Sequence, residues 1–152
     1  MDPLFAAIFD RLEAMHKAIE KVIESLSDEA LDWFPGPDMN SLAVLLAHTL
    51  GAERYWIGDV AGLESSGRVR ETEFEVHGVN AAEFLTHSRE TLEYCRGVLA
   101  RLSADELGQQ RVAPLFGQEV TVAWALAHAL EHTALHTGHI EITRQLWDQR
   151  GR

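Results

Sequence analysis

The sequence has a single cysteine, Cys95, so no disulfide can form within the chain. Cys95 falls in a stretch whose apolar residues have helical spacing, where a lone cysteine is usually a small buried side chain. Apart from Arg96, no basic cluster accompanies it in the sequence to activate the thiol. We therefore expect a buried thiol without a chemical role.

Basic residues are also scarce. The chain has 13 Lys and Arg against 24 Asp and Glu, and its formal net charge is −11. A nucleic-acid-binding protein needs Lys and Arg to neutralise phosphates, and an anionic membrane surface would repel this chain in the same way. The charge therefore excludes nucleic acid and membrane lipid as expected partners. A small molecule or a second copy of the chain, in a homodimer, is the expected partner.

Long apolar runs are missing, because no uninterrupted stretch approaches the roughly 18 residues that cross a bilayer. The N-terminus, MDPLFAAIFDRLEAMHK, has an acid at position 2 and no basic segment leading into an apolar one, so we expect no secretory signal. These absences predict a cytoplasmic protein. With 152 residues, 46% of them hydrophobic, the chain suits a single domain that spans residues 1–152.

Four stretches have the three- and four-residue spacing of apolar side chains that is typical of amphipathic helices: residues 3–26, about 41–60, 80–102 and 121–149. Each begins near a residue that favours a helix start: Pro3, Asn40 or Ser41, Asn80, and Thr121. Strand signals are too few and too short for a sheet. The pattern predicts an all-α fold, a four-helix bundle.

The segments between these stretches indicate breaks. Residues 27–40 contain Pro35-Gly36-Pro37, preceded by a short helical turn that opens at Ser27. Residues 62–78 are rich in glycine, serine and charge, and we assign no regular structure to them. Their length allows a long crossover connection between the second and third helices. Residues 103–119 are irregular, with a short turn at 104–106 and a candidate extended piece at 116–120.

Histidine is the unusual component. Four of the eight histidines fall within twelve residues and occupy an arc of about 80° on a helix: His128, His132, His136 and His139. Histidine is neither a strong helix former nor a preferred core residue, and the alanines and leucines around the stripe do not resemble a solvated face. Two histidines four residues apart can bind one metal ion from neighbouring turns. The stripe therefore predicts a metal site.

A third ligand would come from another helix, as in other bundle-core metal sites, and His48 is the candidate. On the last helix the residues leave the choice of ligands open among four histidines: His128, His132, His136 and His139. Two nearby acids are candidates as further ligands or as acceptors that orient a ring: Glu131 and Glu141. The other histidines are expected to be surface or structural residues: His16, His77 and His87.

The last helix reads TVAWALAHALEHTALHTGHI from Thr121 to Ile140, and the motif PGPDMNSL precedes His48. In these motifs the sequence resembles the DinB-like, or YfiT-like, family of bacterial four-helix metalloproteins, whose last helix carries a His-x-x-x-His-x-Gly-His/Gln-Ile pattern. The resemblance spans nearly the whole chain. The resemblance implies the same four-helix bundle that the apolar spacing predicts.

The resemblance implies that three histidines bind one divalent metal ion, zinc or nickel: His48, His132 and His136. It implies that His139 lies beside the site rather than in it. It also implies that Gly138, which has no side chain, lets another helix approach closely beside the metal.

Family members with assigned activities depend on thiols, and they include mycothiol-dependent maleylpyruvate isomerases and bacillithiol or glutathione S-transferase-like enzymes. We therefore expect the metal to activate a low-molecular-weight thiol that attacks an electrophilic substrate. Three aromatic residues are candidates either to line the substrate cleft or to fill the core: Tyr55, Trp56 and Trp124. The sequence ends at Arg152, without the additional C-terminal domain of the isomerases, which argues against isomerase activity.

Two other functions are compatible with the same site. A metal-dependent hydrolase would use metal-bound water, with Glu131 or Glu53 as a general base. A metal-binding stress or structural protein, dimeric through a helix face, would need no catalytic group at all.

Overall fold

Each long helix of the protein begins at a residue whose side chain caps it. In the computed structural model, which describes residues 1–151, Asp2, Ser41, Asn80 and Thr121 each accept a hydrogen bond from a backbone N–H of the first turn. These caps open the four long helices: α1 (Pro3–Ile23), α3 (Leu42–Arg54), α5 (Ala81–Arg101) and α6 (Val122–Gln149). Ser41 rather than Asn40 is the cap of α3. The predicted helix starts are confirmed.

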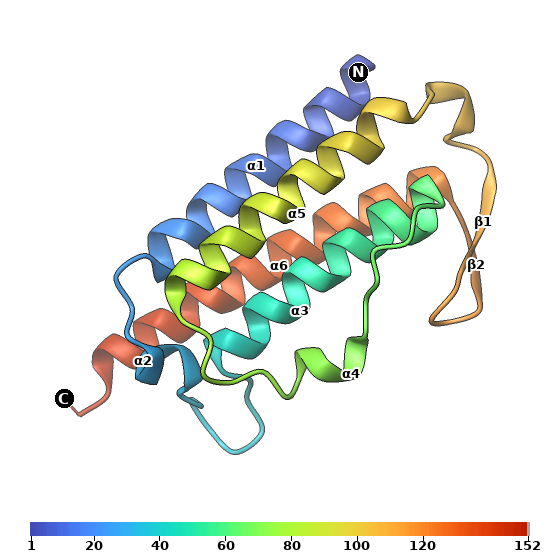
Figure 1. The fold of residues 1–152 in the computed structure, drawn as a ribbon. Coiled ribbons are helices and arrows are strands. Elements are labelled where there is room, and N and C mark those ends of the chain that lie inside the picture. The colour runs from blue at the N-terminus through green and yellow to red at the C-terminus, as the bar shows by residue number, and fades with distance from the viewer. Residues whose placement is uncertain (152) are drawn as a thin grey trace.

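The four long helices form a bundle in which α1 and α3 each pack against both α5 and α6 (Figure 1). In Figure 1, α3 and α5 run in the same direction, so the segment between them must return along the length of the bundle. This segment, residues 63–80, is the long crossover connection. Most of the interior is apolar, with fully buried side chains from every long helix: Phe5, Leu12, Leu42, Leu46, Leu99, Leu126 and Ile140. The all-α bundle is confirmed.

The second predicted helix changes character before its end. After Arg54 the backbone continues as a π-helix, η1 (Tyr55–Gly62), which ends at Leu63 with a positive φ of 53°. The prediction of one regular helix to residue 60 is therefore wrong for its last two turns, because apolar spacing does not distinguish a π-helix from an α-helix. The first helix likewise ends at Ile23 rather than at residue 26.

The connections contain short elements. Ser27 caps α2 (Asp28–Asp32) and Ser103 caps the 3-10 turn η2 (Ala104–Glu106), as expected. The expectation of no regular structure in residues 62–78 is wrong, because α4 (Arg70–Glu73) lies there. It has no side-chain cap and is a single turn, so nothing local indicates it.

A two-stranded antiparallel hairpin precedes the last helix. β2 (Gln118–Thr121) overlaps the predicted extended piece, whereas β1 (Gln110–Ala113) was not expected. Gln110 pairs with Thr121 and Ala113 with Gln118. A four-residue strand has too few alternations to be recognised without its partner.

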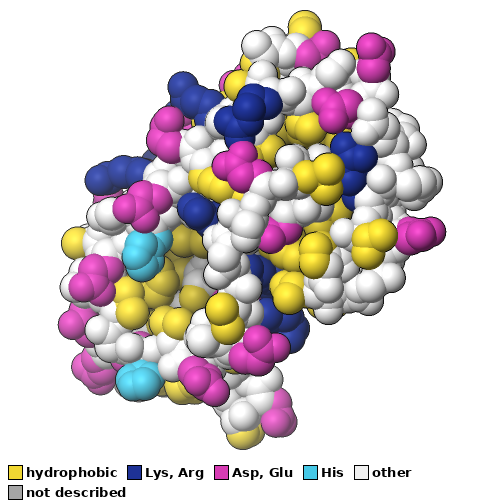
Figure 2. Space-filling view, turned by 45° about the vertical axis from the view of Figure 1, so that its right-hand side comes forward, with side chains coloured by type: hydrophobic (Ala, Val, Ile, Leu, Met, Phe, Trp, Pro, Cys, Tyr) yellow, Lys and Arg dark blue, Asp and Glu magenta, His cyan; other side chains and the backbone are white. Residues whose placement is uncertain are grey.

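Acidic and basic side chains are interspersed around apolar ones on the face shown in Figure 2. Among residues 1–151, no helix is both long enough and apolar enough to span a bilayer.

Candidate metal centre

The bundle brings together three histidines from two helices. His48 lies in the middle of α3, and His132 and His136 lie one turn apart on α6, which packs against α3. One ring nitrogen of each histidine lies within 4.8 Å of those of the other two. The Nε2 atoms of His48 and His132 are 3.1 Å apart. Because the three nitrogens converge on one point, this cluster has the geometry to hold a metal ion.

The spacing of these two nitrogens is compatible with a shared metal ion as well as with a hydrogen bond. Two nitrogens bound at about 2.1 Å in a tetrahedral site lie about 3.4 Å apart, close to the separation of the two Nε2 atoms. In addition, Nδ1 of His132 is buried and has no hydrogen-bond partner among residues 1–151. The nitrogen that approaches His48 is Nε2, so this unpaired Nδ1 is a polar group that the site leaves unsatisfied.

The environment keeps two of the clustered rings, His132 and His136, neutral, which is the form that binds metal. Burial, followed by the neighbouring rings of His136 and His48, lowers the pKa of His132 to about 3. Burial and the ring of His48 likewise lower the pKa of His136 to about 4. At neutral pH both rings therefore offer a lone pair without first losing a proton.

A carboxylate that the sequence analysis missed orients His48. Oε2 of Glu73, at the end of α4, lies 2.9 Å from Nδ1 of His48. Arg68 donates two hydrogen bonds to the same carboxylate, at 2.6 and 2.9 Å. Burial raises the pKa of Glu73, but the hydrogen bonds from Arg68 and His48 outweigh it and place the pKa below its usual value. The ionised carboxylate therefore accepts a hydrogen bond from the Nδ1–H of His48 and leaves the Nε2 lone pair facing the cluster.

The backbone of α3 makes room for this carboxylate at Gly51. A Cβ atom at Gly51 would lie 2.2 Å from Oε1 of Glu73. A glycine three residues after a candidate ligand histidine is the one sequence signal of the contact, but it does not identify which residue lies against it.

The other sequence candidates lie outside the three-histidine cluster. Nδ1 of His139 is 3.3 Å from Nδ1 of His136, so His139 lies beside the cluster. The ring of His128 stacks on Trp124, with ring centres 4.9 Å apart and planes 10° apart. The Glu131 side chain is 80% exposed and lies 3.8 Å from His128, and Glu141 is also exposed. The structure thus brings none of these side chains into the cluster.

Two other sequence expectations concern Gly138 and Cys95. Gly138 does not support a close helix contact, because a Cβ atom there would meet nothing within 4 Å, and that expectation is wrong. Gly138 is an exposed position of α6. Cys95 is completely buried, as expected, and burial followed by the nearby Glu53 carboxylate raises its pKa well above the usual value. The Cys95 thiol therefore stays protonated.

The remaining histidines differ in their surroundings. His16 is 1% exposed and lies within the bundle, whereas His77 and His87 are exposed.

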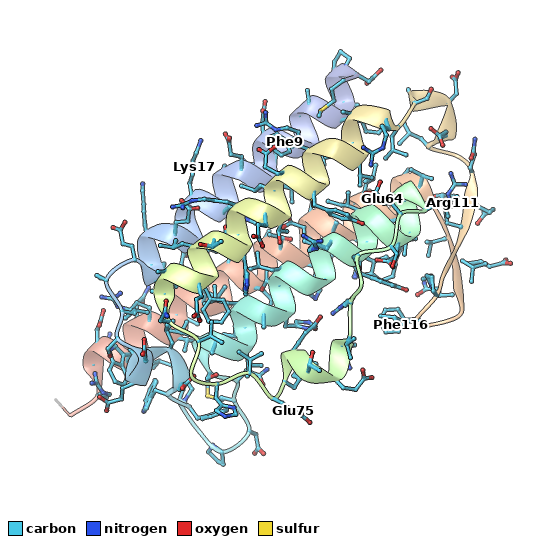
Figure 3. The ribbon with its side chains drawn as sticks, viewed as in Figure 1. Phe9, Lys17, Glu64, Glu75, Arg111 and Phe116 are labelled. Atoms are coloured by element: carbon cyan, nitrogen blue, oxygen red, sulfur yellow. The ribbon has the colours of Figure 1, made fainter. Side chains whose placement is uncertain are left out.

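Three aromatic side chains pack together near the cluster, and we call them the aromatic wall: Trp56, Phe116 and Trp124. Trp56 from η1 stacks on Phe116, with ring centres 5.8 Å apart, and makes an edge contact with Trp124. Figure 3 shows Phe116 pointing from the hairpin turn toward the bundle. Phe116 is 51% exposed and Trp124 is 41% exposed, whereas Tyr55 and Trp56 are buried. Of the three aromatic residues considered from the sequence, only Trp124 has a substantial exposed surface.

His128 lies between the aromatic wall and the three clustered histidines. The His128 ring lies 4.7 Å from Trp56 and 5.8 Å from His132, centre to centre. Phe74, which is 40% exposed, lies 5.1 Å from the ring of His48, centre to centre. Exposed aromatic surface therefore lies near the three histidines.

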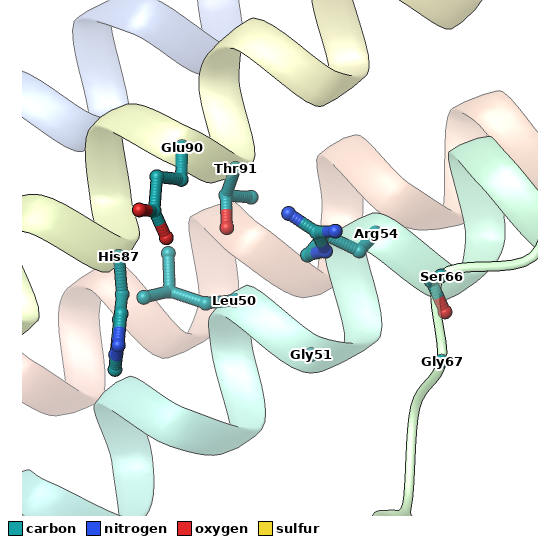
Figure 4. Close-up of a pocket in the computed structure, with 8 residues that line it drawn as sticks. All are labelled: Leu50, Gly51, Arg54, Ser66, Gly67, His87, Glu90 and Thr91. Atoms are coloured by element: carbon teal, nitrogen blue, oxygen red, sulfur yellow. The ribbon is translucent and has the colours of Figure 1, made fainter.

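A cavity of about 510 Å³ lies between α3, α5 and the crossover (Figure 4). It is lined by Leu50, Gly51, Arg54, Ser66, Gly67, His87, Glu90 and Thr91. None of the three clustered histidines lines it, so it is not the cavity of the metal centre.

Comparisons with known proteins agree with this architecture. A family model described as mycothiol-S-transferase matches residues 7–149. The crystal structure of a conserved protein from Enterococcus faecalis has a TM-score of 0.76 at 15% identity, and the match covers 95% of this chain and 97% of that one. A DinB-like protein from Bacillus cereus ATCC 10987 has a TM-score of 0.69 at 17% identity, with 86% of this chain and 84% of that one covered. No curated protein matches the chain. The predicted DinB-like fold is confirmed, and at these identities the two structures support the fold alone.

Proposed function

Since the chain belongs to the mycothiol-S-transferase family, we propose that it is a metal-dependent enzyme that joins a low-molecular-weight thiol to an electrophilic substrate. The observation that carries the proposal is the close approach of ring nitrogens from three histidines on α3 and α6. Three protein ligands leave a coordination position open to a small molecule, which is typical of catalytic rather than structural sites.

In this proposal the ligands are His48, His132 and His136. Zinc or nickel, when bound by them, lowers the pKa of a coordinated thiol so that the nucleophilic thiolate forms near neutral pH. Glu73 keeps Nδ1 of His48 protonated and its Nε2 lone pair directed at the cluster. Arg68 in turn fixes the carboxylate of Glu73 by two hydrogen bonds.

The aromatic wall is the proposed surface for the electrophile. Phe116 and Trp124 expose ring surface that a planar apolar group can cover, and His128 links this surface to His132. A substrate lying on the wall would present its electrophilic carbon beside the histidine cluster. The thiol sulfur would bond to that carbon, the leaving group would depart with its electron pair, and the thiol proton would pass to solvent.

Metal-dependent hydrolysis is less well supported, because it needs a free general base at the site. Glu131 is largely exposed to solvent, away from the cluster. Glu53 is buried, and its two carboxylate oxygens already accept hydrogen bonds from His16 and Thr133. Neither acid is placed to take a proton from water bound by the three histidines.

The first test is the metal content of untagged protein, measured by elemental analysis. We expect about one equivalent of metal in the wild type and its loss in His48→Ala and His132→Ala, with helical content retained. His77→Ala, which removes an exposed histidine elsewhere, should keep the metal. If the wild type binds no metal even after reconstitution with zinc and nickel, the proposal fails.

The second test separates the reaction classes. Metal-loaded protein is assayed with an aromatic electrophile and a panel of low-molecular-weight thiols, with and without each thiol. Turnover that requires a particular thiol supports the transferase. Turnover of an ester without thiol would favour a hydrolase, and metal binding without either activity would leave a non-catalytic metal-binding protein.

Three expectations from the sequence stay predictions: a single domain over residues 1–152, a homodimer, and a cytoplasmic location. Light scattering of the purified protein tests the homodimer, and cell fractionation tests the location.

A further inference from the structure

A second group of polar side chains lies inside the bundle, apart from the three histidines. Its members come from all four long helices and are each at most 2% exposed: His16, Glu53, Ser88, Cys95 and Thr133. The Glu53 carboxylate is at the centre. Nε2 of His16 lies 3.0 Å from one of its oxygens, and the Thr133 hydroxyl donates to the same oxygen at 3.1 Å.

The network continues from Glu53 to α5. The Cys95 thiol lies 3.6 Å from the other carboxylate oxygen, and Nδ1 of His16 lies 2.7 Å from the Ser88 hydroxyl. Thus each side chain of the group has a polar partner. A buried carboxylate is expensive to desolvate, and well-packed apolar residues would often stabilise a core as much or more. Stability alone therefore does not account for a glutamate at this position.

The position of the network relative to the histidines suggests its role. Glu53 is on the same helix as His48, and Thr133 directly follows His132 on α6. Apart from the contact between His48 and His132, the bond from Thr133 to Glu53 is the one side-chain hydrogen bond between α3 and α6 in residues 1–151. It therefore links the two ligand-bearing helices next to the cluster.

A link of this kind matters because metal ligands tolerate little displacement, with distances held within about 0.2 Å. Apolar packing accepts small shifts and alternative side-chain arrangements, so it defines the relative position of two helices only loosely. A hydrogen bond between a hydroxyl and a carboxylate is directional, and it is lost when one helix slides or rotates against the other.

We propose that Glu53 is a positioning residue of the metal centre, and that its hydrogen bond from Thr133 keeps α6 in the register at which His132 faces His48. This inference rests on the proposed metal-binding function. Nε2 of His16 also contacts the Glu53 carboxylate from α1, whereas the Ser88 hydroxyl contacts only Nδ1 on the other side of that ring, so Ser88 takes no part in the link between α3 and α6.

The test compares metal affinity among variants by titrating apo protein with Co²⁺ and recording its visible absorption. Thr133→Val removes the hydroxyl at nearly constant volume, and we expect Co²⁺ binding to weaken about tenfold or more. The absorption spectrum of the bound Co²⁺ should also change, because the ligand geometry is altered. Thr133→Ser keeps the hydroxyl and should restore both the affinity and the spectrum.

Two control variants separate positioning from general stability. Thr49→Val removes a buried hydroxyl next to His48 that bonds only to Leu45 of its own helix. Ser88→Ala removes a hydrogen bond of the network without cutting the link from α3 to α6. Both controls should bind Co²⁺ like the wild type, even where thermal unfolding shows that the apo protein is less stable.

The outcomes distinguish the two proposals. If the wild type binds Co²⁺ and Thr133→Val binds it equally well with the same spectrum, the positioning role of Glu53 is wrong and the metal centre stands. The same conclusion follows if affinity merely tracks the stability of the apo protein across all four variants. If the wild type binds no Co²⁺, Zn²⁺ or Ni²⁺, the metal centre itself is wrong, and the positioning role is overturned with it.

Discussion

Glu73 and His48 form a carboxylate–histidine pair between the crossover connection and α3, with Oε2 and Nδ1 2.9 Å apart. The two residues are 25 positions apart in the sequence, and both side chains are largely shielded from solvent. Arg68 holds the same carboxylate, so the crossover is fastened to α3 beside the candidate ligand. A connection that looks like a simple loop in the sequence thus contributes to the chemistry of the site.

Replacing Glu73 with glutamine tests this pair. Glutamine keeps the shape but loses the charge that holds the proton on Nδ1 of His48, and we expect metal affinity to fall about 10- to 100-fold. Competition with a chromophoric chelator measures the dissociation constant. Glu75→Gln, an exposed neighbour, is the matched control and should bind as the wild type does. Equal affinities in both variants would show that Glu73 has no part in the metal centre.

Gly51 should be intolerant of any side chain. In Gly51→Ala the new Cβ would overlap Oε1 of Glu73, so the carboxylate must move away from His48. We expect both weaker metal binding and a loss of about 1–3 kcal/mol in the free energy of unfolding, measured with urea. Gly97→Ala on α5, whose Cβ would meet only the end of the Arg101 side chain, should instead be neutral or stabilising by up to about 1 kcal/mol. A Gly51→Ala protein as stable as Gly97→Ala would contradict the observed crowding.

The long helices and the three clustered histidines were predictable because their signals are local. Asn80 and Thr121 act as caps within the first turn of their own helices, and apolar spacing defines the buried face. His132 and His136 lie on one side of α6 as a consequence of helical geometry alone. The residues also offered His48 as the ligand from a second helix, but they left open which histidines of α6 would join it, and the family resemblance selected His132 and His136.

Glu53 and Glu73 could not be assigned from the sequence for the opposite reason. Their partners lie on other elements, and no spacing along the chain indicates that Thr133 meets Glu53 or that Arg68 and His48 share Glu73. An acid in a helix or in a polar loop normally points into solvent, and the fold alone turns these two inward. Only the packed structure shows such contacts.

The apo protein should become less stable as the pH falls below neutrality. The pKa of His132 is about 3 and that of His136 about 4 in the folded protein, against 6.5 for an ordinary histidine. Between about pH 6.5 and pH 4 the unfolded chain therefore binds protons that the folded protein excludes, so the free energy of unfolding falls as the pH falls. Glu73 adds to the loss only at lower pH, because its pKa lies below 4.5.

Urea unfolding of the apo protein at pH 7, 6 and 5 measures this dependence. A variant with both His132→Asn and His136→Asn should lose less stability over the interval than the wild type does, whereas His77→Asn should follow the wild type. The same slope in all three proteins would mean that the clustered rings are protonated as readily in the folded as in the unfolded state.

The last prediction concerns the aromatic wall and its effect on which electrophilic substrates the protein accepts. Phe116→Ala removes an exposed ring that stacks on Trp56, without touching the three histidines. Aromatic stacking contributes about 0.5–1.5 kcal/mol, so KM for an aromatic electrophile should rise about two- to tenfold while metal content and kcat stay close to the wild-type values. KM for a small aliphatic electrophile should not change. Phe34→Ala, which removes an equally exposed ring between α2 and α3, is the control. If Phe34→Ala and Phe116→Ala behave alike with both substrates, the electrophile does not lie on the wall, and the surface formed by Phe116 and Trp124 must be explained by another contact.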